Sequence, residues 1–309
     1  MKLMKRLLLW LALIPLLLFI TGLLLHPYLA ITEPSGSDTA VVEGWIPPEL
    51  MPQVKAEIER RGYERIYTTG TIRPFAYWLR KDRSITVALP KKMEGGVRIV
   101  TAGLPGVQLI VMIDGDTAMV RPVKGDTTSY WLQPDRPFST IRIASIANGA
   151  ASDVDVLFTK DLFIRGSNVH SLASAIWIED AGGNRRPGSP TYAHHAAEIL
   201  SSGPNGREVT PVPAMVIERG RTRANAEAFA KKAIEDEITS VDIISMGVHA
   251  RRSRRMYQSA LGEQVQVGVI SIPDPEALRG SWWRTPLGWS RLLKEMVGMP
   301  IAAADTDGR

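Results

Sequence analysis

The feature that most constrains this fold is a β-α-β pattern that stops near residue 75 and resumes more than 100 residues later. An apolar strand over 39–45, a helix over 49–62 with apolar residues at helical spacing, and a strand over 65–69 form one β-α-β unit. A unit this small cannot bury a core of its own. We therefore predict that later segments complete its sheet.

Helices and strands alternate again in the last third of the chain. The expected helices cover 191–200, 221–235, 251–261 and 289–297, and the expected strands cover 209–216, 241–246 and 265–272. The predicted fold class is therefore α/β. A Rossmann-like, three-layer parallel-sheet domain (39–75 plus 186–300) is interrupted by an all-β sandwich insertion and followed by a tail (301–309).

The insertion spans residues 82–180 and reads as many short strands separated by turns. Asp114-Gly115-Asp116 between two apolar runs is a strong hairpin signal, and strands at this spacing are typical of a β-sandwich or barrel. Insertions are tolerated at surface loop tips, and 70–74 after a strand is such a place. The alternative of three independent domains leaves 39–72 without a core.

The N-terminus predicts a membrane anchor within residues 1–30. Lys2, Lys5 and Arg6 precede an uncharged, Leu-rich run over 7–25, which as a helix is about 28 Å long, close to the hydrocarbon thickness of a bilayer. A cleaved signal peptide, the alternative, has a shorter apolar region. The positive-inside rule then predicts a single-pass protein of the bacterial cell membrane, with its main body extracytoplasmic (periplasmic in a Gram-negative cell) beyond a linker at 31–38.

Composition narrows the chemistry. The chain has no cysteine, which excludes disulfide scaffolds, cysteine-ligated metal centres and thiol nucleophiles. The net charge of +5 and a pI near 9.4 indicate anionic surroundings. Outside the cytoplasm these are anionic lipid or wall polymer, and no basic stripe with interleaved aromatics predicts a nucleic-acid partner.

Two motifs follow predicted strands of the α/β domain. Arg221 and Thr222 begin a helix, where free backbone N–H groups favour anions and Thr222 is a candidate cap. His249 and Arg252 follow the next strand, and ligands of open α/β sheets bind at the carboxyl ends of strands. His249 is the candidate acid or base and Arg252 a candidate phosphate ligand. The alternative is a solvated helix face and an incidental histidine.

The combination is more specific than its parts. Val41-Val42-Glu43-Gly44, then Thr68-Thr69-Gly70, Thr-x-x-Asn-Ala at 222–226 and His-x-x-Arg at 249–252 occur in that order. The chain thereby resembles the bacterial YdcF/SanA/ElyC-like family of cell-envelope α/β proteins, and the resemblance extends to Trp282-Trp283-Arg284 and the segment from Trp289 to Glu295. It implies that a ligand pocket is lined by Glu43, Gly44, Thr69, Gly70, Arg221, Thr222, Asn225, His249 and Arg252.

The chain departs from the family pattern at two places. Thr71 stands where the family often has a second glycine, and Tyr192-Ala193-His194-His195 stands where it tends to place a carboxylate. These departures favour a pocket that binds without turnover.

The insertion resembles the xylan-binding family-60 type of calcium-dependent carbohydrate-binding module. The resemblance implies that Asn148, Asp153 and Asp155 hold calcium, although Gly149 falls where another carboxylate is usual. The alternative is that these are ordinary turn residues. In that case Tyr130, Trp131 and Trp177 still offer stacking faces for sugar.

We therefore expect a membrane-anchored protein that binds or acts on a phosphorylated or lipid-linked cell-envelope glycan precursor. Its partners are then the membrane and an envelope polysaccharide or lipid-linked glycan. The alternative is a non-catalytic envelope scaffold or glycan sensor.

Overall fold

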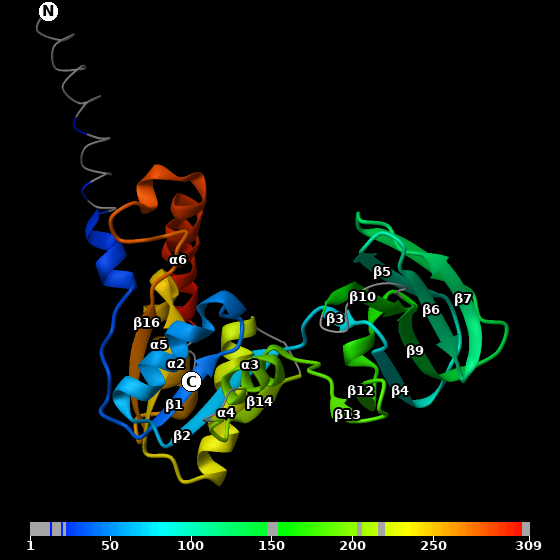
Figure 1. Cartoon of the computed structure of the whole chain (residues 1–309). Helices are drawn as coiled ribbons and strands as arrows, with labels where there is room; N and C mark the ends of the chain where they lie inside the picture. Colours follow the sequence, from blue (N-terminus) through cyan, green and yellow to red (C-terminus); the bar gives the residue numbers. More distant parts are fainter. Residues whose placement is uncertain are drawn as a thin grey trace, which may run out of the picture. The chain divides into compact units, whose positions relative to one another are not determined.

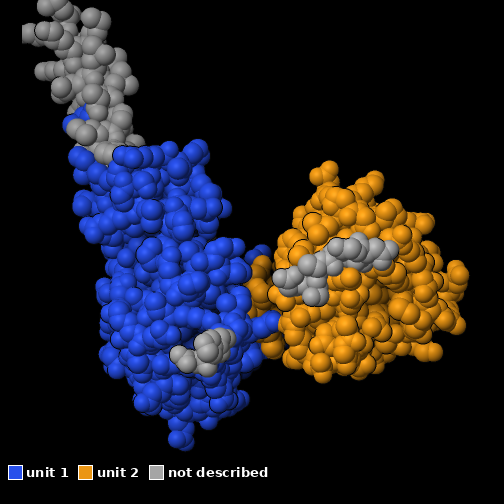
Figure 2. All heavy atoms as spheres, viewed as in Figure 1, with its two compact units in different colours: residues 1–71, 196–309 blue, residues 72–195 orange. Residues whose placement is uncertain are grey.

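The computed structural model describes Leu13, Ile20 and residues 23–146, 154–202, 206–215 and 220–304. The chain divides into two compact units (Figures 1 and 2). Unit 1 comprises residues 1–71 and 196–309, and unit 2 comprises residues 72–195. The chain thus leaves unit 1 directly after the second strand of the β-α-β pattern.

Unit 1 is built on one parallel sheet. Its strands are β1 (Thr39–Glu43), β2 (Arg65–Thr71), β14 (Thr210–Ala214), β15 (Ser240–Met246) and β16 (Gln266–Ile272), in the order β14-β2-β1-β15-β16. Counted within the sheet this order is 3-2-1-4-5, that of a doubly wound α/β domain. The direction of winding reverses between β1 and β15, so a crevice is expected at their carboxyl ends.

Helices cover both faces of this sheet, which gives three layers. On one face α2 (Met51–Arg61) and α3 (Tyr192–Ser201) share a core with the strands, and on the other α4 (Arg221–Glu235) and α5 (Ala250–Leu261) do so. The last helix, α6 (Pro286–Ala304), starts earlier and ends later than the sequence predicts and packs on α5. Single-turn helices are η1 (Pro48–Leu50), η2 (Val169–Ser171), η3 (Gly247–His249) and η4 (Trp282–Arg284).

The local sequence explains where α2 begins and ends. Pro52 lies in its first turn, where a missing N–H costs nothing, and Gly62 ends it in the left-handed conformation with φ 68°. Met51, Val54 and Ile58 form its buried stripe at helical spacing.

Unit 2 consists of two antiparallel sheets with a common apolar core. One has the order β11-β10-β5-β8 with β3 beside β10, and the other has the order β13-β12-β4-β9-β6-β7. The strands are β3 (Tyr77–Arg80), β4 (Ser84–Met93), β5 (Val97–Gly103), β6 (Gln108–Ile113), β7 (Asp116–Pro122), β8 (Thr128–Leu132), β9 (Phe138–Ile146), β10 (Asp155–Ile164), β11 (Ser167–Asn168), β12 (Ala175–Glu179) and β13 (Arg185–Pro187). The hairpin predicted at 114–116 joins β6 to β7, with positive φ at Asp114 and Gly115.

The N-terminal segment differs from its prediction in part. Most of the expected membrane helix over 7–25 lies outside the described residues, and among those described no helix is long and apolar enough to cross a membrane. Residues 31–38, which composition predicts as a linker, are instead bonded to the sheet of unit 1. Glu33 and Val269 of β16 exchange backbone hydrogen bonds of 2.8 and 2.9 Å, and Ser35 bonds Asp242 of β15.

The close packing of residues 34–35 on Gly268 of β16 leads to a prediction about stability. A Cβ there would lie 2.0 Å from Oδ1 of Asp242 and 2.3 Å from the backbone N of Ser35, two atoms that are hydrogen-bonded to each other. We expect Gly268→Ala to lower the free energy of unfolding by about 3 kcal/mol, since overpacking a filled site forces its neighbours apart. Urea denaturation measures the change, and Gly280→Ala, whose Cβ meets nothing within 4 Å, is the matched control. Equal effects of the two substitutions would contradict the packing.

Candidate functional site

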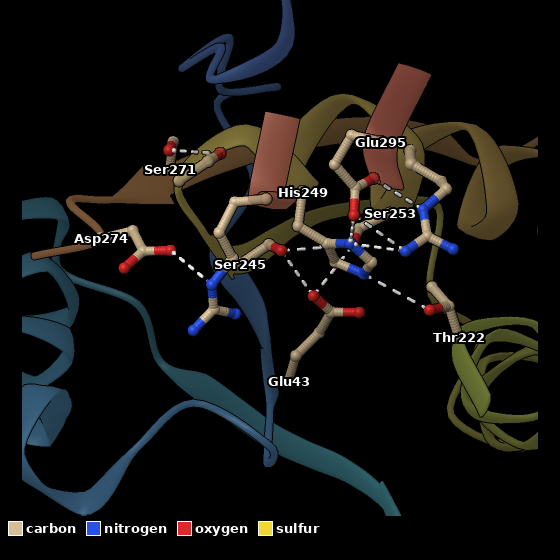
Figure 3. A network of polar contacts seen from close by, with 11 residues as sticks. Glu43, Thr222, Ser245, His249, Ser253, Ser271, Asp274 and Glu295 are labelled. Carbon is tan, nitrogen blue, oxygen red and sulfur yellow. Dashed lines mark hydrogen bonds and ion pairs between the residues drawn. The ribbon is translucent and has the colours of Figure 1, made fainter. Parts of the chain in front are cut away.

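The candidate site lies at the carboxyl ends of β1 and β15, where the sheet reverses its winding. Glu43 is the last residue of β1 and His249 ends η3 directly after β15. The register that pairs Val42 with Ile244 places Glu43 beside Ser245. The topology therefore brings both predicted motifs and the end of the first strand together (Figure 3).

His249 is held at both ring nitrogens (Figure 3). Its Nδ1 lies 2.9 Å from Oε1 of Glu295 and its Nε2 lies 3.3 Å from Oγ1 of Thr222. The ring of Trp45 packs edge-on against the imidazole, with 5.0 Å between centroids. The side chain of His249 is 12% exposed, so the ring is fixed yet accessible.

Glu295, on α6, is the buried anion of the site. Arg252 binds both of its oxygens, with Nε 2.7 Å from Oε2 and Nη2 3.0 Å from Oε1. Burial alone would raise the pKa of Glu295, but the hydrogen bonds and charges of His249 and Arg252 outweigh it and hold this pKa below its usual 4.5. The carboxylate is therefore ionised and accepts a hydrogen bond from Nδ1–H of His249.

Glu43, at the end of β1, is a second carboxyl group and is fully buried. Its Oε2 accepts hydrogen bonds from the hydroxyls of Ser245 at 2.5 Å and Ser253 at 2.9 Å. Its Oε1 is buried and has no hydrogen-bond partner among the described residues. Burial, together with the nearby charge of Glu43, raises the pKa of Tyr257 well above its usual value. A buried acceptor without a donor is costly, so this oxygen is a feature that packing alone does not explain.

The structure unites part of the predicted residue set. Thr222, His249 and Arg252 meet at the site, but the guanidinium of Arg252 is directed to Glu295 and so positions the histidine. Asn225 is buried, and its Oδ1 lacks a partner among the described residues. Arg221, at the first position of α4, is exposed.

Thr69, Gly44 and Gly70, which were also predicted to line the pocket, make hydrogen bonds or strand pairs within unit 1. The hydroxyl of Thr69 lies 2.7 Å from that of Tyr257. Gly44 donates its backbone N–H to the carbonyl of Thr69, and Gly70 pairs with Pro213 of β14. Thr222 is also not the cap of α4, because the N-cap is Gly220.

The expected carboxylate at residues 192–195 is missing from the sequence, yet the site has two carboxylates from elsewhere. Glu43 comes from β1 and Glu295 from α6, whereas His194 bonds Thr191 with Nδ1 2.7 Å from Oγ1. Nothing in the sequence indicates that Ser245 and Ser253 donate hydrogen bonds to Glu43. The family resemblance covers the segment from Trp289 to Glu295, but it assigns no function to Glu295.

Three residues, Asn148, Asp153 and Asp155, are the predicted calcium ligands. Asn148 and Asp153 lie outside the described residues. Asp155 is described, and its Oδ1 lies 3.8 Å from Nε of Arg80. Among the residues that the structure describes, no group of three acidic or histidine side chains could hold a metal.

A groove of about 850 Å³ on unit 2 is lined by two of the three predicted sugar-stacking residues, Tyr130 and Trp131. Trp131 is 72% exposed, and its ring lies 5.6 Å from Cζ of Arg98, which also covers the ring of Phe163 at 4.4 Å. The planar and polar side chains around the groove include Trp131, Asp116, Arg121, Gln133, Asp135 and Arg136. The hydroxyl of Tyr130 donates a hydrogen bond to the backbone carbonyl of Pro122. Trp177, the third candidate, does not line the groove and is covered by Arg185.

No family model and no curated protein match the chain. It is similar to a solved sugar-binding protein, the EclA C-terminal domain, at 14% identity and a TM-score of 0.22, over 30% of this chain and 78% of that one. It is also similar to a GDSL-like lipase of Bacteroides ovatus ATCC 8483, at 13% identity and a TM-score of 0.17, over 69% of this chain and 81% of that one. At these TM-scores neither likeness carries an argument about fold or function.

The lowered pKa of Glu295 generates a prediction about stability and pH. Glu295→Gln leaves Arg252 without its anion, so we expect a loss of about 3 kcal/mol in the free energy of unfolding at pH 7. Because the folded pKa is lowered, this contribution is complete above the unfolded value near 4.5 and is lost as the pH falls through the folded value. Denaturation of both proteins from pH 7 to pH 3 should show the gap closing, whereas Glu59→Gln, at an exposed position, should show none. A gap that is constant across this range would contradict the ion pair.

Proposed function

We propose that this protein is a membrane-anchored, extracytoplasmic protein that binds and acts on a phosphorylated or lipid-linked cell-envelope glycan precursor. The observation that carries the proposal is the imidazole of His249, fixed by Glu295 and facing Thr222 at the start of α4. The membership in the YdcF/SanA/ElyC-like family and the N-terminal anchor remain part of the proposal.

The start of α4 suits an anionic group. The first N–H groups of a helix have no acceptor within it, and the helix dipole adds positive potential there. Arg221 adds an exposed guanidinium at the same end, and charge-assisted hydrogen bonds are the strong ones. A phosphate group next to Thr222 and His249 would meet the free N–H groups, the helix dipole and the guanidinium of Arg221.

The two states of His249 support proton transfer. When Nδ1–H donates a hydrogen bond to Glu295, Nε2 of the neutral ring is an acceptor that faces the hydroxyl of Thr222. After gaining a proton, Nε2 becomes a donor while Glu295 stabilises the imidazolium. A base oriented in this way suits hydrolysis or transfer of a phosphate ester, and Arg252 contributes by positioning Glu295.

The groove on unit 2 supports the glycan part of the proposal. An exposed tryptophan next to planar carboxylate, amide and guanidinium groups offers a face for the ring and hydrogen bonds for the hydroxyls of a sugar. This mode requires no metal. Calcium held by Asn148, Asp153 and Asp155 would be a second mode of glycan binding. The experiment below distinguishes it from binding in the groove.

The test measures binding of polyprenyl phosphate and of soluble peptidoglycan fragments to the full chain in detergent. Since a lost charge-assisted bond costs about 1.5–3 kcal/mol, His249→Ala should weaken polyprenyl phosphate binding by about tenfold to a hundredfold. Lys231→Ala removes an exposed cation farther along α4 and should leave binding unchanged.

The peptidoglycan measurement resolves the two glycan modes. Trp131→Ala should weaken fragment binding by roughly three- to tenfold if the groove is used, since one stacking contact contributes about 1 kcal/mol. A loss with chelator or Asp155→Ala would assign binding to calcium instead. If the wild-type chain binds neither probe, the proposal fails and the non-catalytic scaffold remains.

A further inference from the structure

Thr222, His249 and Glu295 form a line of three hydrogen-bonding groups (Figure 3). A hydroxyl lies within reach of one ring nitrogen, and a buried carboxylate orients the ring through the other. This is the arrangement that activates a hydroxyl nucleophile in unrelated hydrolases, where the distance from hydroxyl to base is often looser in the absence of substrate. We propose that Thr222 is the nucleophile of the site and forms a covalent ester with the group that is transferred.

The orientation of the ring depends on a choice between two partners of Nδ1. Glu295 lies 2.9 Å from Nδ1, and so does Nη2 of Arg252. Only one can be its partner, because a carboxylate needs the Nδ1 proton and a guanidinium needs the Nδ1 lone pair. Arg252 already donates to both oxygens of Glu295, and the lowered pKa keeps that group ionised, so Nδ1 carries the proton and Nε2 is free to accept from Thr222.

Thr222 has no capping role that would occupy its hydroxyl. The N-cap of α4 is Gly220, with φ 102°, and Thr222 is the second residue of this 15-residue helix. Its side chain is half-buried, and its hydroxyl lies 3.3 Å from Nε2 of His249. The N–H groups of this first turn can stabilise negative charge that develops on the attacked centre.

The step balances with the groups present and a phosphate ester substrate. The hydroxyl proton of Thr222 moves to Nε2 of His249, Oγ1 forms a bond to phosphorus, and the bond from phosphorus to the leaving oxygen breaks. The leaving alcohol takes the proton from Nε2. Water then attacks phosphorus with its proton going to Nε2, the bond to Oγ1 breaks, and Thr222 recovers its proton.

This inference rests on the proposed function only for the identity of the substrate, so its test uses a reagent that contains no glycan. The full chain in detergent is treated with an alkyl phosphonofluoridate, from which an activated hydroxyl displaces fluoride. Cleavage after glutamate releases the peptide 219–227, which keeps Thr222 intact where trypsin would cut on either side of it. Mass spectrometry of that peptide measures the label, and circular dichroism checks that each variant is folded.

We expect one label per chain, located on Thr222. Thr222→Ser should keep it and Thr222→Ala should lose it. His249→Ala should slow labelling by about a hundredfold or more, as for the loss of a general base. Glu295→Gln should slow it at least tenfold, with recovery in Glu295→Asp, and should change the pH profile of the rate, which a merely structural role would not do.

Absence of label on Thr222 in the folded wild-type chain, or equal rates with and without His249, would overturn the inference. Labelling of Thr222 without any binding of polyprenyl phosphate or glycan would leave the nucleophile in place and remove the proposed substrate. Binding of polyprenyl phosphate or glycan without labelling of Thr222 would support the proposed substrate and overturn the nucleophile.

Discussion

The pairing of β1 with β15 is the interaction on which unit 1 and its site depend. Residues 40–42 align with residues 242–244 across about 200 residues of intervening chain. Together with the pairing of β2 with β14, this joins the two parts of the interrupted domain in one sheet. It also places Glu43 beside Ser245, whose hydroxyl and that of Ser253 share one carboxylate oxygen. A buried carboxyl group at the end of the central strand needs such donors, which ties the polar layer to the register.

The site is completed by the C-terminal helix. Trp282 and Leu292 are buried with Val248 in a small core that fastens α6 to the loop carrying His249. This packing brings Glu295 to Nδ1 of His249 from 46 residues away. The chemistry of the histidine is therefore set by an element that makes no strand of the sheet. Rigid placement of this kind is what a catalytic or binding geometry requires.

Periodicity predicted the elements of unit 1 well where they are long and amphipathic. The bounds of α4 agree with those expected, and β15 and β16 agree within one residue. The length of α6 was missed because the end of this helix has no polar face. In unit 2 the strands β3, β11 and β13 were missed because strands of two to four residues have little periodicity. Glu295 and Ser253 could not be assigned from the sequence, since their role depends on which helix faces lie against His249. The lack of a carboxylate at 192–195 does not leave the site without one, because Glu43 and Glu295 come from other elements.

The most direct test of the central claim is the tautomer of His249, measured by ¹⁵N NMR of the full chain with labelled histidine. The chain has five histidines, and the His249→Ala variant identifies the signal. We expect the neutral ring to carry its proton on Nδ1, and Glu295→Gln to shift that proton towards the more usual Nε2 form. A proton on Nε2 in the wild-type chain, or no response to Glu295→Gln, would contradict the arrangement on which the proposed chemistry rests.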